Sequence, residues 1–219
     1  MRHELRDYAN ADAVAAAAAN YVARFSRQAI DDHGHFTFAV SGGRTPWSMF
    51  EKLAKMDVAW DDVVIYQVDE RIAPVGDATR NLTNLENSLG DRRPTVVAMP
   101  VNDDDLDEAA ASYAQTLPPH FDLVHLGLGP DGHTASLIPG DPVLDVRDRL
   151  VAVTGVYQGE QRMTLTYEAL ARAQQLLWLI TGEDKRSALA ALLSGDTSIP
   201  AGCVVAPSSL VMADEAALS

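Results

Sequence analysis

The chain has 219 residues, and 47% of them are hydrophobic, which is enough for one sizeable core. Its formal net charge is −14, from 17 Lys and Arg residues against 31 Asp and Glu residues. This balance argues against a nucleic-acid or anionic-membrane partner, and any small anionic ligand would have to be held by a few local Arg or Lys side chains.

The first predicted helix covers residues 11–29, where Val14, Val22 and Phe25 form an apolar stripe among alanines. The same alanine-rich segment is a poor signal peptide, because acidic residues lie within and before it and no cationic region precedes it. No apolar segment approaches the roughly 20 residues that are needed to cross a bilayer. Residues 36–40 are apolar and predict a buried strand.

A glycine-rich turn, Ser-Gly-Gly-Arg-Thr-Pro at residues 41–46, joins this strand to a helical pattern through residue 54. Thr45 is expected to cap the helix, and Pro46 is expected to take its first position. Ser41 opens the turn, and Gly42 and Gly43 would let backbone N–H groups converge at the positive end of the helix. The turn has the design of a phosphate cradle with Arg44 as an extra cation. A tight turn that binds nothing is the alternative.

The next predicted strand, residues 63–68, runs directly into Asp69, Glu70 and Arg71. Three charged residues at the end of a buried strand are costly unless they pair with each other or face a cleft. Both interpretations are open from the sequence. The polar segment that follows, as far as Asn84, is predicted to be a loop. A strand at residues 95–99 and a helix at residues 107–117 come next.

The strand predicted at residues 121–126 leads into a loop that carries Asp131 and His133 between glycines. An α/β protein places a catalytic base on such a loop, at the carboxyl end of a strand. The loop also contains the pattern G-x-G-x-x-G from Gly127 to Gly132. That dinucleotide fingerprint must open a long helix, whereas Pro139 and Gly140 would end any helix here after about one turn. The sequence therefore argues against dinucleotide binding.

The last third of the chain predicts strands at residues 150–153, 175–180 and 210–213, and helices at residues 167–173 and 183–193. Lys185 lies in the first turn of a helix, where the dipole disfavours a cation unless it is exposed or points at a bound anion. Cys203 is the only cysteine, which predicts a cytoplasmic protein without an intramolecular disulfide. Strands that alternate with helices predict an α/β domain with a mostly parallel sheet covered on both faces.

Five blocks occur in order along the chain: Ser41-Gly-Gly-Arg-Thr-Pro46, Asp69-Glu-Arg71, the loop from Leu126 to Gly140, Arg162-Met-Thr-Leu-Thr166 and Gly182-Glu-Asp-Lys185. Together they resemble the 6-phosphogluconolactonase family, within the group that includes glucosamine-6-phosphate deaminases. The resemblance implies a three-layer α/β/α, Rossmann-like fold in a single domain over residues 1–219, with or without a small accessory β subdomain. It also implies hydrolysis of 6-phosphoglucono-δ-lactone to 6-phosphogluconate without a metal or other cofactor, in a monomer or weak homo-oligomer.

The resemblance also implies roles for individual residues. His133 would be the general base that activates water, with Asp131 or Asp69 orienting the base or the water, and Arg71 or backbone N–H groups would stabilise the oxyanion. The residues implied for phosphate binding are Ser41, Gly42, Gly43, Arg44, Arg162 and Lys185. Asn81 and Gly129 are carried over as substrate-binding positions. Arg44 and Arg80 stand where family members often carry a small hydroxyl residue and a serine.

Two alternatives share the fold. A sugar-phosphate isomerase-deaminase of the same group would carry a glutamate five residues after the histidine, but this position is Ile138, which cannot move protons. A non-catalytic sugar-phosphate sensor would keep the cradle and could lose the base. This chain keeps Asp131 and His133 and shows no basic arm, so the lactonase is the favoured interpretation.

Overall fold

A computed structural model describes residues 2–219 of the chain. Seven strands form one sheet in the order β1-β10-β9-β6-β2-β3-β5, and each neighbouring pair in it is parallel. These strands are β1 (Glu4–Tyr8), β2 (Phe36–Val40), β3 (Val63–Gln67), β5 (Thr95–Val97), β6 (Phe121–Leu126), β9 (Ala173–Ile180) and β10 (Ser208–Asp214). The predicted mostly parallel sheet is therefore confirmed.

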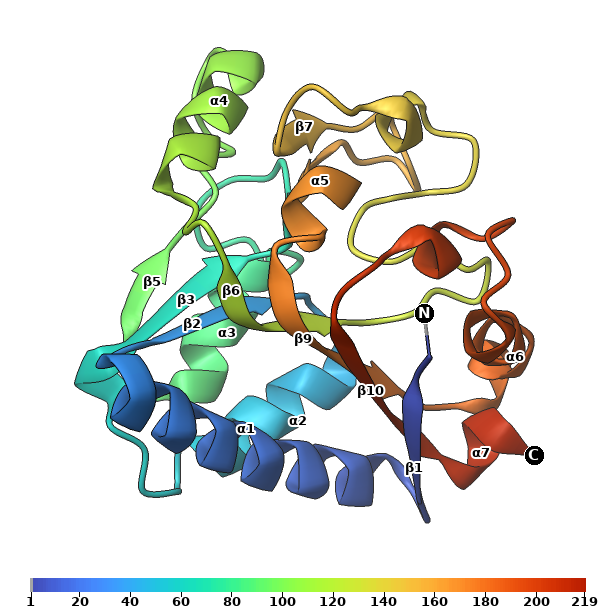
Figure 1. Ribbon diagram of the computed structural model, residues 1–219. Helices are drawn as coiled ribbons and strands as arrows, with labels where there is room; N and C mark the ends of the chain where they lie inside the picture. The colour runs from blue at the N-terminus through green and yellow to red at the C-terminus, as the bar shows by residue number, and fades with distance from the viewer. Residues whose placement is uncertain (1) are drawn as a thin grey trace.

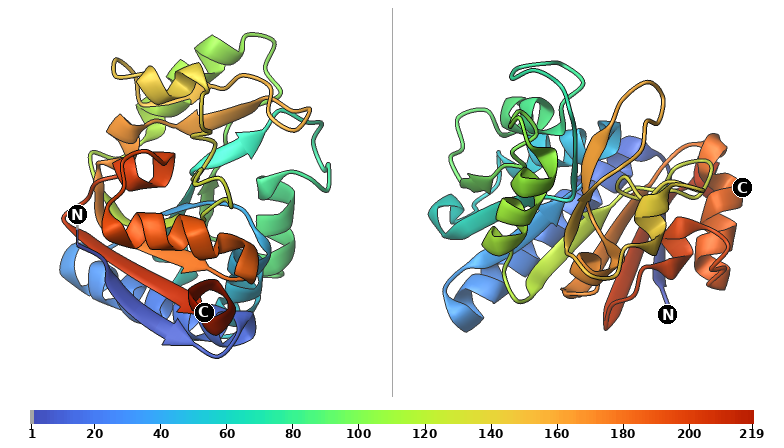
Figure 2. Two further views of the ribbon diagram at one scale, coloured as in Figure 1. Left: turned by 90° about the vertical axis from the view of Figure 1, so that its right-hand side faces the viewer. Right: turned by 90° about the horizontal axis from the view of Figure 1, so that it is seen from above.

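A second, antiparallel sheet has the strand order β4-β8-β7. Its strands are β4 (Asp69–Arg71), β7 (Val151–Val153) and β8 (Arg162–Leu165). It lies above the main sheet, on the side away from the long helix α1 (Figures 1 and 2). This small sheet is the accessory β subdomain, whose presence the family resemblance did not decide.

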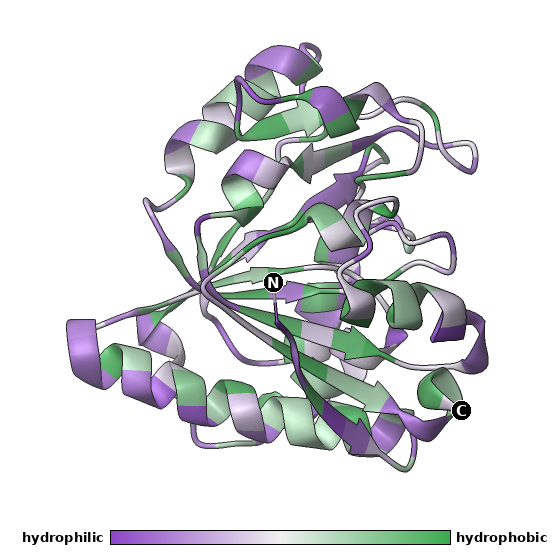
Figure 3. Ribbon diagram, turned by 45° about the vertical axis from the view of Figure 1, so that its right-hand side comes forward, coloured by the Kyte–Doolittle hydropathy of each residue, from purple (hydrophilic) through white to green (hydrophobic). Residues whose placement is uncertain are grey.

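Helices cover both faces of the main sheet and complete three layers (Figure 1). One face packs on α1 (Ala11–His33), α2 (Arg44–Leu53) and α3 (Asn81–Leu89). The other face packs on α4 (Leu106–Thr116), α5 (Tyr167–Leu170), α6 (Arg186–Ser194), α7 (Glu215–Leu218) and the small sheet. Figure 3 shows the hydrophobic strands between helices whose outward faces are polar. Burial of apolar surface between these layers is the main source of stability.

Several elements differ from the sequence prediction. β1 was not predicted, because its residues are mostly polar and it pairs on one side only, with β10. The loop predicted as far as Asn84 is wrong from residue 81, where α3 begins. Residues 162–165 form a strand, whereas the sequence pattern suggested a lead into the next helix.

The cap of α3 explains why this helix was missed. The carboxylate of Glu70 accepts the backbone N–H groups of Asn81 at 2.7 Å and Leu82 at 2.8 Å. A carboxylate at a helix N-terminus satisfies free N–H groups and complements the helix dipole. Because the capping residue lies on β4, eleven residues earlier than Asn81, the local sequence carries no N-cap signal. Glu70 itself is fully buried and has a structural role.

The order of the main sheet fixes where a ligand can bind. From β2 the chain builds outward through β3 to β5, then returns to place β6 on the other side of β2. The direction of winding therefore reverses between β2 and β6. Loops at the carboxyl ends of two such strands diverge and leave a crevice at the sheet edge. Among residues 2–219, no helix combines the length and apolar character that a membrane crossing requires.

Candidate active site

A cavity of about 500 Å³ lies at this point of the sheet. Its walls come from the loops after β2, β6 and β9, from β4 and β8 of the small sheet, and from the start of α3. Every predicted site residue except Asp131 lines it: Ser41, Gly42, Gly43, Arg44, Asp69, Arg71, Asn81, Gly129, His133, Arg162 and Lys185. The sequence blocks thus meet in one cavity of the size that holds a small molecule.

Asp131 is exposed and does not line the cavity, but it holds His133. The Nδ1 atom of His133 is 2.5 Å from Oδ1 of Asp131, which also accepts the backbone N–H of His133 at 3.2 Å. Burial raises the pKa of Asp131, but its bonds to His133 and to the Tyr157 hydroxyl outweigh burial and leave that pKa below its ordinary value. The ionised carboxylate therefore accepts the Nδ1 proton and leaves the lone pair on Nε2 of the ring.

Gly129 makes room for this pair. A Cβ atom at position 129 would lie 2.1 Å from Nδ1 of His133 and 2.6 Å from Oδ1 of Asp131. The Gly129 backbone also donates to the carbonyl of His133 at 2.8 Å, which closes the loop around the histidine. The glycine carried over as a substrate-binding position therefore has a direct packing role beneath the base.

Replacing Gly129 by alanine is expected to displace the histidine ring and to lower kcat by about 10²-fold, the scale associated with a misplacement of roughly 1 Å. Steady-state kinetics with the substrate that the family resemblance implies, 6-phosphogluconolactone, measure this effect. Gly140→Ala is the control for backbone strain without a steric clash, since Gly140 has a positive φ of 79° and no atom within 4 Å of an added Cβ. Full activity of the Gly129 variant would contradict this packing role.

Asp69, the first residue of β4, is buried, with only 8% of its surface exposed. Its carboxylate accepts the Ser136 hydroxyl at 2.6 Å and the Asn81 side-chain amide at 3.3 Å. Burial raises the pKa of Asp69, opposed by the bond from Ser136 and the charge of Arg162. Asp69 and Arg71 both face the cavity, whereas Glu70 between them does not. The charged triplet therefore divides into two site residues and one structural residue.

The raised pKa of Asp69 predicts a stability effect of Asp69→Asn. A carboxyl group whose folded pKa exceeds its unfolded value stabilises the fold at low pH and loses that contribution as pH rises. We expect the asparagine variant to melt above the wild type at pH 8, with a smaller difference near pH 4. Each kcal/mol corresponds to roughly 2–4 °C for a protein of this size. Thermal unfolding at both pH values provides the measurement, and equal differences would refute the pH effect.

The turn after β2 also lines the cavity. The helix α2 starts at Arg44, with Gly43 at its N-cap position, so the prediction that Thr45 caps the helix and Pro46 starts it is wrong. Gly43 has a φ of 139°, which a residue with a side chain rarely adopts. The shift leaves Pro46 inside the first turn, where its missing N–H still costs no helical hydrogen bond. The Gly43 conformation thus brings the helix N-terminus to the cavity.

Gly42 fits closely against α3. A Cβ atom at position 42 would lie 2.0 Å from Oδ1 of Asn81, whose Nδ2 donates to the backbone carbonyl of Asp69 at 2.9 Å. Asn81 thus joins the turn after β2 to β4 and lines the cavity, as expected for the position carried over. Behind the turn, the buried His125 accepts the Ser41 N–H at 3.3 Å, and burial lowers the pKa of His125 to about 3.

Four cationic side chains line the cavity and differ in burial and in ion pairing. Arg162 is buried, with 6% of its surface exposed. Among residues 2–219 it forms no ion pair with a carboxylate. Arg71 pairs with Glu160 at 2.9 Å, and Lys185 pairs with the exposed Asp184 at 3.0 Å. Arg44 is exposed at the mouth of the cavity. The unpaired Arg162 is the cation best prepared to receive an anion.

Three contributors to this site were not predicted from the sequence. Ser136 lies within the recognised loop but was not singled out, although its hydroxyl binds Asp69. Thr181 binds the Thr45 hydroxyl at 2.8 Å and joins the loop after β9 to the turn after β2. Tyr157 contacts Asp131, and the Gln158-Gly159 turn beside it was a usable hairpin signal.

Comparison with known proteins agrees with this geometry. Residues 9–214 match the family described as glucosamine-6-phosphate isomerases/6-phosphogluconolactonase. The 6-phosphogluconolactonase of Synechocystis sp. is 35% identical over 176 residues, which cover 74% of this chain and 73% of that relative. The 6-phosphogluconolactonase of Mesorhizobium japonicum is 36% identical over 187 residues, covering 80% and 79%.

A solved structure, the 6-phosphogluconolactonase from Thermotoga maritima, superimposes with a TM-score of 0.87 and 26% sequence identity. The match covers 97% of this chain and 99% of that one. The family model spans nearly the whole chain, and both sequence relatives exceed one third identity over most of their length. The resemblance carried by the five sequence blocks is thus confirmed, and the chain belongs to the glucosamine-6-phosphate isomerase/6-phosphogluconolactonase family.

Proposed function

We propose that this protein is a 6-phosphogluconolactonase that hydrolyses 6-phospho-D-glucono-1,5-lactone, with His133 as the base that activates water. The observation that supports this proposal is that a carboxylate-held histidine and a glycine turn with several cations share one cavity. His133 is held by Asp131 on the loop after β6, and the Ser41–Gly43 turn, Arg162 and Lys185 line the same cavity. The relatives named above carry the same enzyme name.

The reaction begins when Nε2 of His133 takes a proton from a water molecule, whose oxygen attacks the lactone carbonyl. The resulting tetrahedral intermediate carries an oxyanion that needs donors placed in advance, either Arg71 or backbone N–H groups of the loops. Collapse of the intermediate breaks the ring ester bond. The imidazolium can return its proton to the departing ring oxygen, which becomes a hydroxyl group. No covalent enzyme intermediate is needed, because a δ-lactone is an activated ester.

The remaining polar residues suit the sugar and its phosphate. The N–H groups of Gly42 and Gly43 and the N-terminus of α2 attract an anion, and Arg44, Arg162 and Lys185 add positive charge. A sugar hydroxyl both donates and accepts hydrogen bonds. Asp69 offers an acceptor and Asn81 a donor, and the two groups lie 3.3 Å apart. Asp69 could alternatively orient the attacking water. This arrangement binds a dianionic sugar despite the overall charge of −14.

The deaminase chemistry found in the same group is disfavoured by the structure around position 138. Ile138 is 5% exposed and belongs to the hydrophobic core, and it supplies no proton relay for ring opening of an amino sugar. We also propose that the protein is cytoplasmic, acts as a single domain, forms a monomer or weak homo-oligomer and binds no nucleic acid.

The test is hydrolysis of 6-phosphogluconolactone formed immediately beforehand by oxidation of glucose-6-phosphate. We expect lactone decay far faster than spontaneous hydrolysis, and no release of ammonia from glucosamine-6-phosphate under the same conditions. Lactone decay at the spontaneous rate would refute the proposed function. Ammonia release would instead assign the chain to the deaminase branch of its family.

A further inference from the structure

A short hairpin between β7 and β8 overhangs the base. Its turn consists of Gln158 and Gly159, both with positive φ, of 53° and 83°. Tyr157 and Glu160 face each other across this turn, joined by backbone hydrogen bonds of 2.9 and 3.2 Å. Two central residues with positive φ match the backbone twist of a tight hairpin and fix its register. The positions of Tyr157 and Glu160 are therefore set by the backbone.

Tyr157 contacts the base pair and a phosphate-site cation at once. Its hydroxyl donates to Oδ2 of Asp131 at 3.2 Å, the oxygen that His133 does not use. Its ring meets the His133 ring edge to face, with centroids 5.8 Å apart. The guanidinium of Arg162 lies over the same ring, with Cζ 5.2 Å from the centroid. Burial and the Asp131 charge raise the pKa of Tyr157, so the hydroxyl stays protonated and donates.

We propose that Tyr157 is a positioning residue that orients the Asp131–His133 pair and holds Arg162 ready for the phosphate. This inference rests on the proposed lactonase function. Tyr157 does not line the cavity, so it acts through its neighbours rather than on the substrate. With its two oxygens bound to different partners, the Asp131 carboxylate cannot rotate away from Nδ1 of His133.

The choice of an aromatic partner for Arg162 also has a physical reason. A carboxylate beside Arg162 would occupy its N–H donors and repel the substrate phosphate. An aromatic face attracts the guanidinium through its quadrupole and leaves those donors free. Arg71, by contrast, is paired with Glu160 of the same hairpin. The hairpin thus fixes two cations of the site in two different ways.

The two contacts of Tyr157 can be separated by substitution. Tyr157→Phe removes the bond to Asp131 and keeps the ring, so kcat should fall roughly 3- to 10-fold while KM stays unchanged. Tyr157→Leu also removes the aromatic face beneath Arg162, which should raise KM by roughly 3- to 10-fold in addition. Val156→Ala is the control, because Val156 lies on the same hairpin and is 72% exposed. It should match the wild type in both parameters.

Binding of the product 6-phosphogluconate, measured by calorimetry, separates this inference from the proposed function. Tyr157→Leu should weaken binding, and Tyr157→Phe should not. A wild type without activity and without affinity for 6-phosphogluconate would refute the proposed function itself. An active wild type whose Tyr157→Phe variant retains full kcat, or whose two Tyr157 variants behave alike, would overturn the positioning role. Thermal unfolding of each variant confirms that the kinetics report on folded protein.

Discussion

Substitution of His133 by alanine is expected to lower kcat for lactone hydrolysis by about 10²- to 10⁴-fold, the usual contribution of a positioned general base. KM should change little, because the substrate phosphate is proposed to bind the turn after β2 and the nearby cations rather than His133. Asp131 accepts the Nδ1 proton of His133 and leaves Nε2 as the basic atom. The proposed abstraction of a proton from water requires this tautomer. The measurement is steady-state hydrolysis of 6-phosphogluconolactone, corrected for its spontaneous decay.

Two further variants sharpen this test. Asp131→Asn replaces the acceptor carboxylate by an amide, whose N–H group can donate to Nδ1 of His133 and so favour the tautomer protonated on Nε2. We expect kcat to fall while the fold is kept. His120→Ala is the matched control, because His120 is exposed and lies outside the cavity. Loss of affinity for 6-phosphogluconate in the His133 variant, with kcat preserved, would reassign the histidine from base to binding residue.

The parts of the site that the sequence predicts are those encoded by short contiguous segments. Apolar runs mark β2, β3 and β6, and the glycines that follow mark the turns that carry Gly42 and His133. Parallel strands end at a common edge of the sheet, and the residues of these separate blocks accordingly line one cavity.

The parts that the sequence does not predict depend on contacts between distant residues. Glu70 caps α3 from another element, and Ser136 binds Asp69 across 67 positions of the chain. The contact between Tyr157 and Asp131 joins two loops that only the small sheet brings together. Residue patterns within a window carry no information on such pairs. The supporting contacts of the site therefore emerge only from the tertiary structure.

A buried arginine without a carboxylate partner also shows that the site is built at some cost to stability. Desolvation of a charge is unfavourable unless an opposite charge or hydrogen bonds compensate, and the Nε atom of Arg162 has no hydrogen-bond partner. The raised pKa of Asp69 reflects the same kind of cost nearby. A bound phosphate would supply the negative ion-pair partner that Arg162 lacks. Ligand binding should therefore stabilise the fold as well as satisfy the site.

Replacing Arg162 by methionine tests this trade-off between binding and stability. We expect KM for 6-phosphogluconolactone to rise by roughly 10- to 100-fold, since a hydrogen bond to a charged group contributes about 1.5–3 kcal/mol. The free protein should melt at an equal or higher temperature than the wild type, because an apolar side chain replaces a buried charge that has no ion-pair partner, and this gain should exceed the lost attraction between Arg162 and Asp69. Lys185→Ala should raise KM less, because Lys185 is already paired with Asp184.

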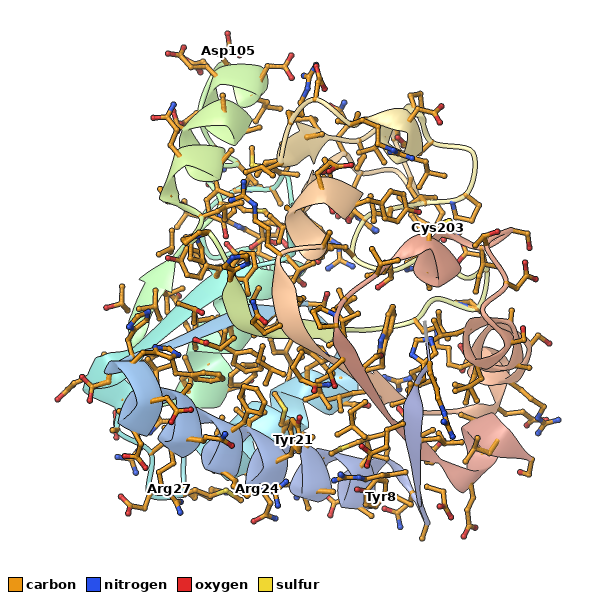
Figure 4. All side chains as sticks on the ribbon, viewed as in Figure 1. Tyr8, Tyr21, Arg24, Arg27, Asp105 and Cys203 are labelled. Atoms are coloured by element: carbon orange, nitrogen blue, oxygen red, sulfur yellow. The ribbon has the colours of Figure 1, made fainter. Side chains whose placement is uncertain are left out.

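The matched control is Arg27→Met, which makes the same change in net charge on the exposed side of α1, away from the cavity (Figure 4). It should leave both KM and the melting temperature near the wild-type values. If Arg162→Met and Arg27→Met shifted KM equally, the effect would come from the global field acting on an anionic substrate. A large rise in KM for Arg162→Met alone, together with retained stability, would identify Arg162 as a cation kept unpaired for the phosphate. If Arg162 were a structural residue, its removal would destabilise the protein.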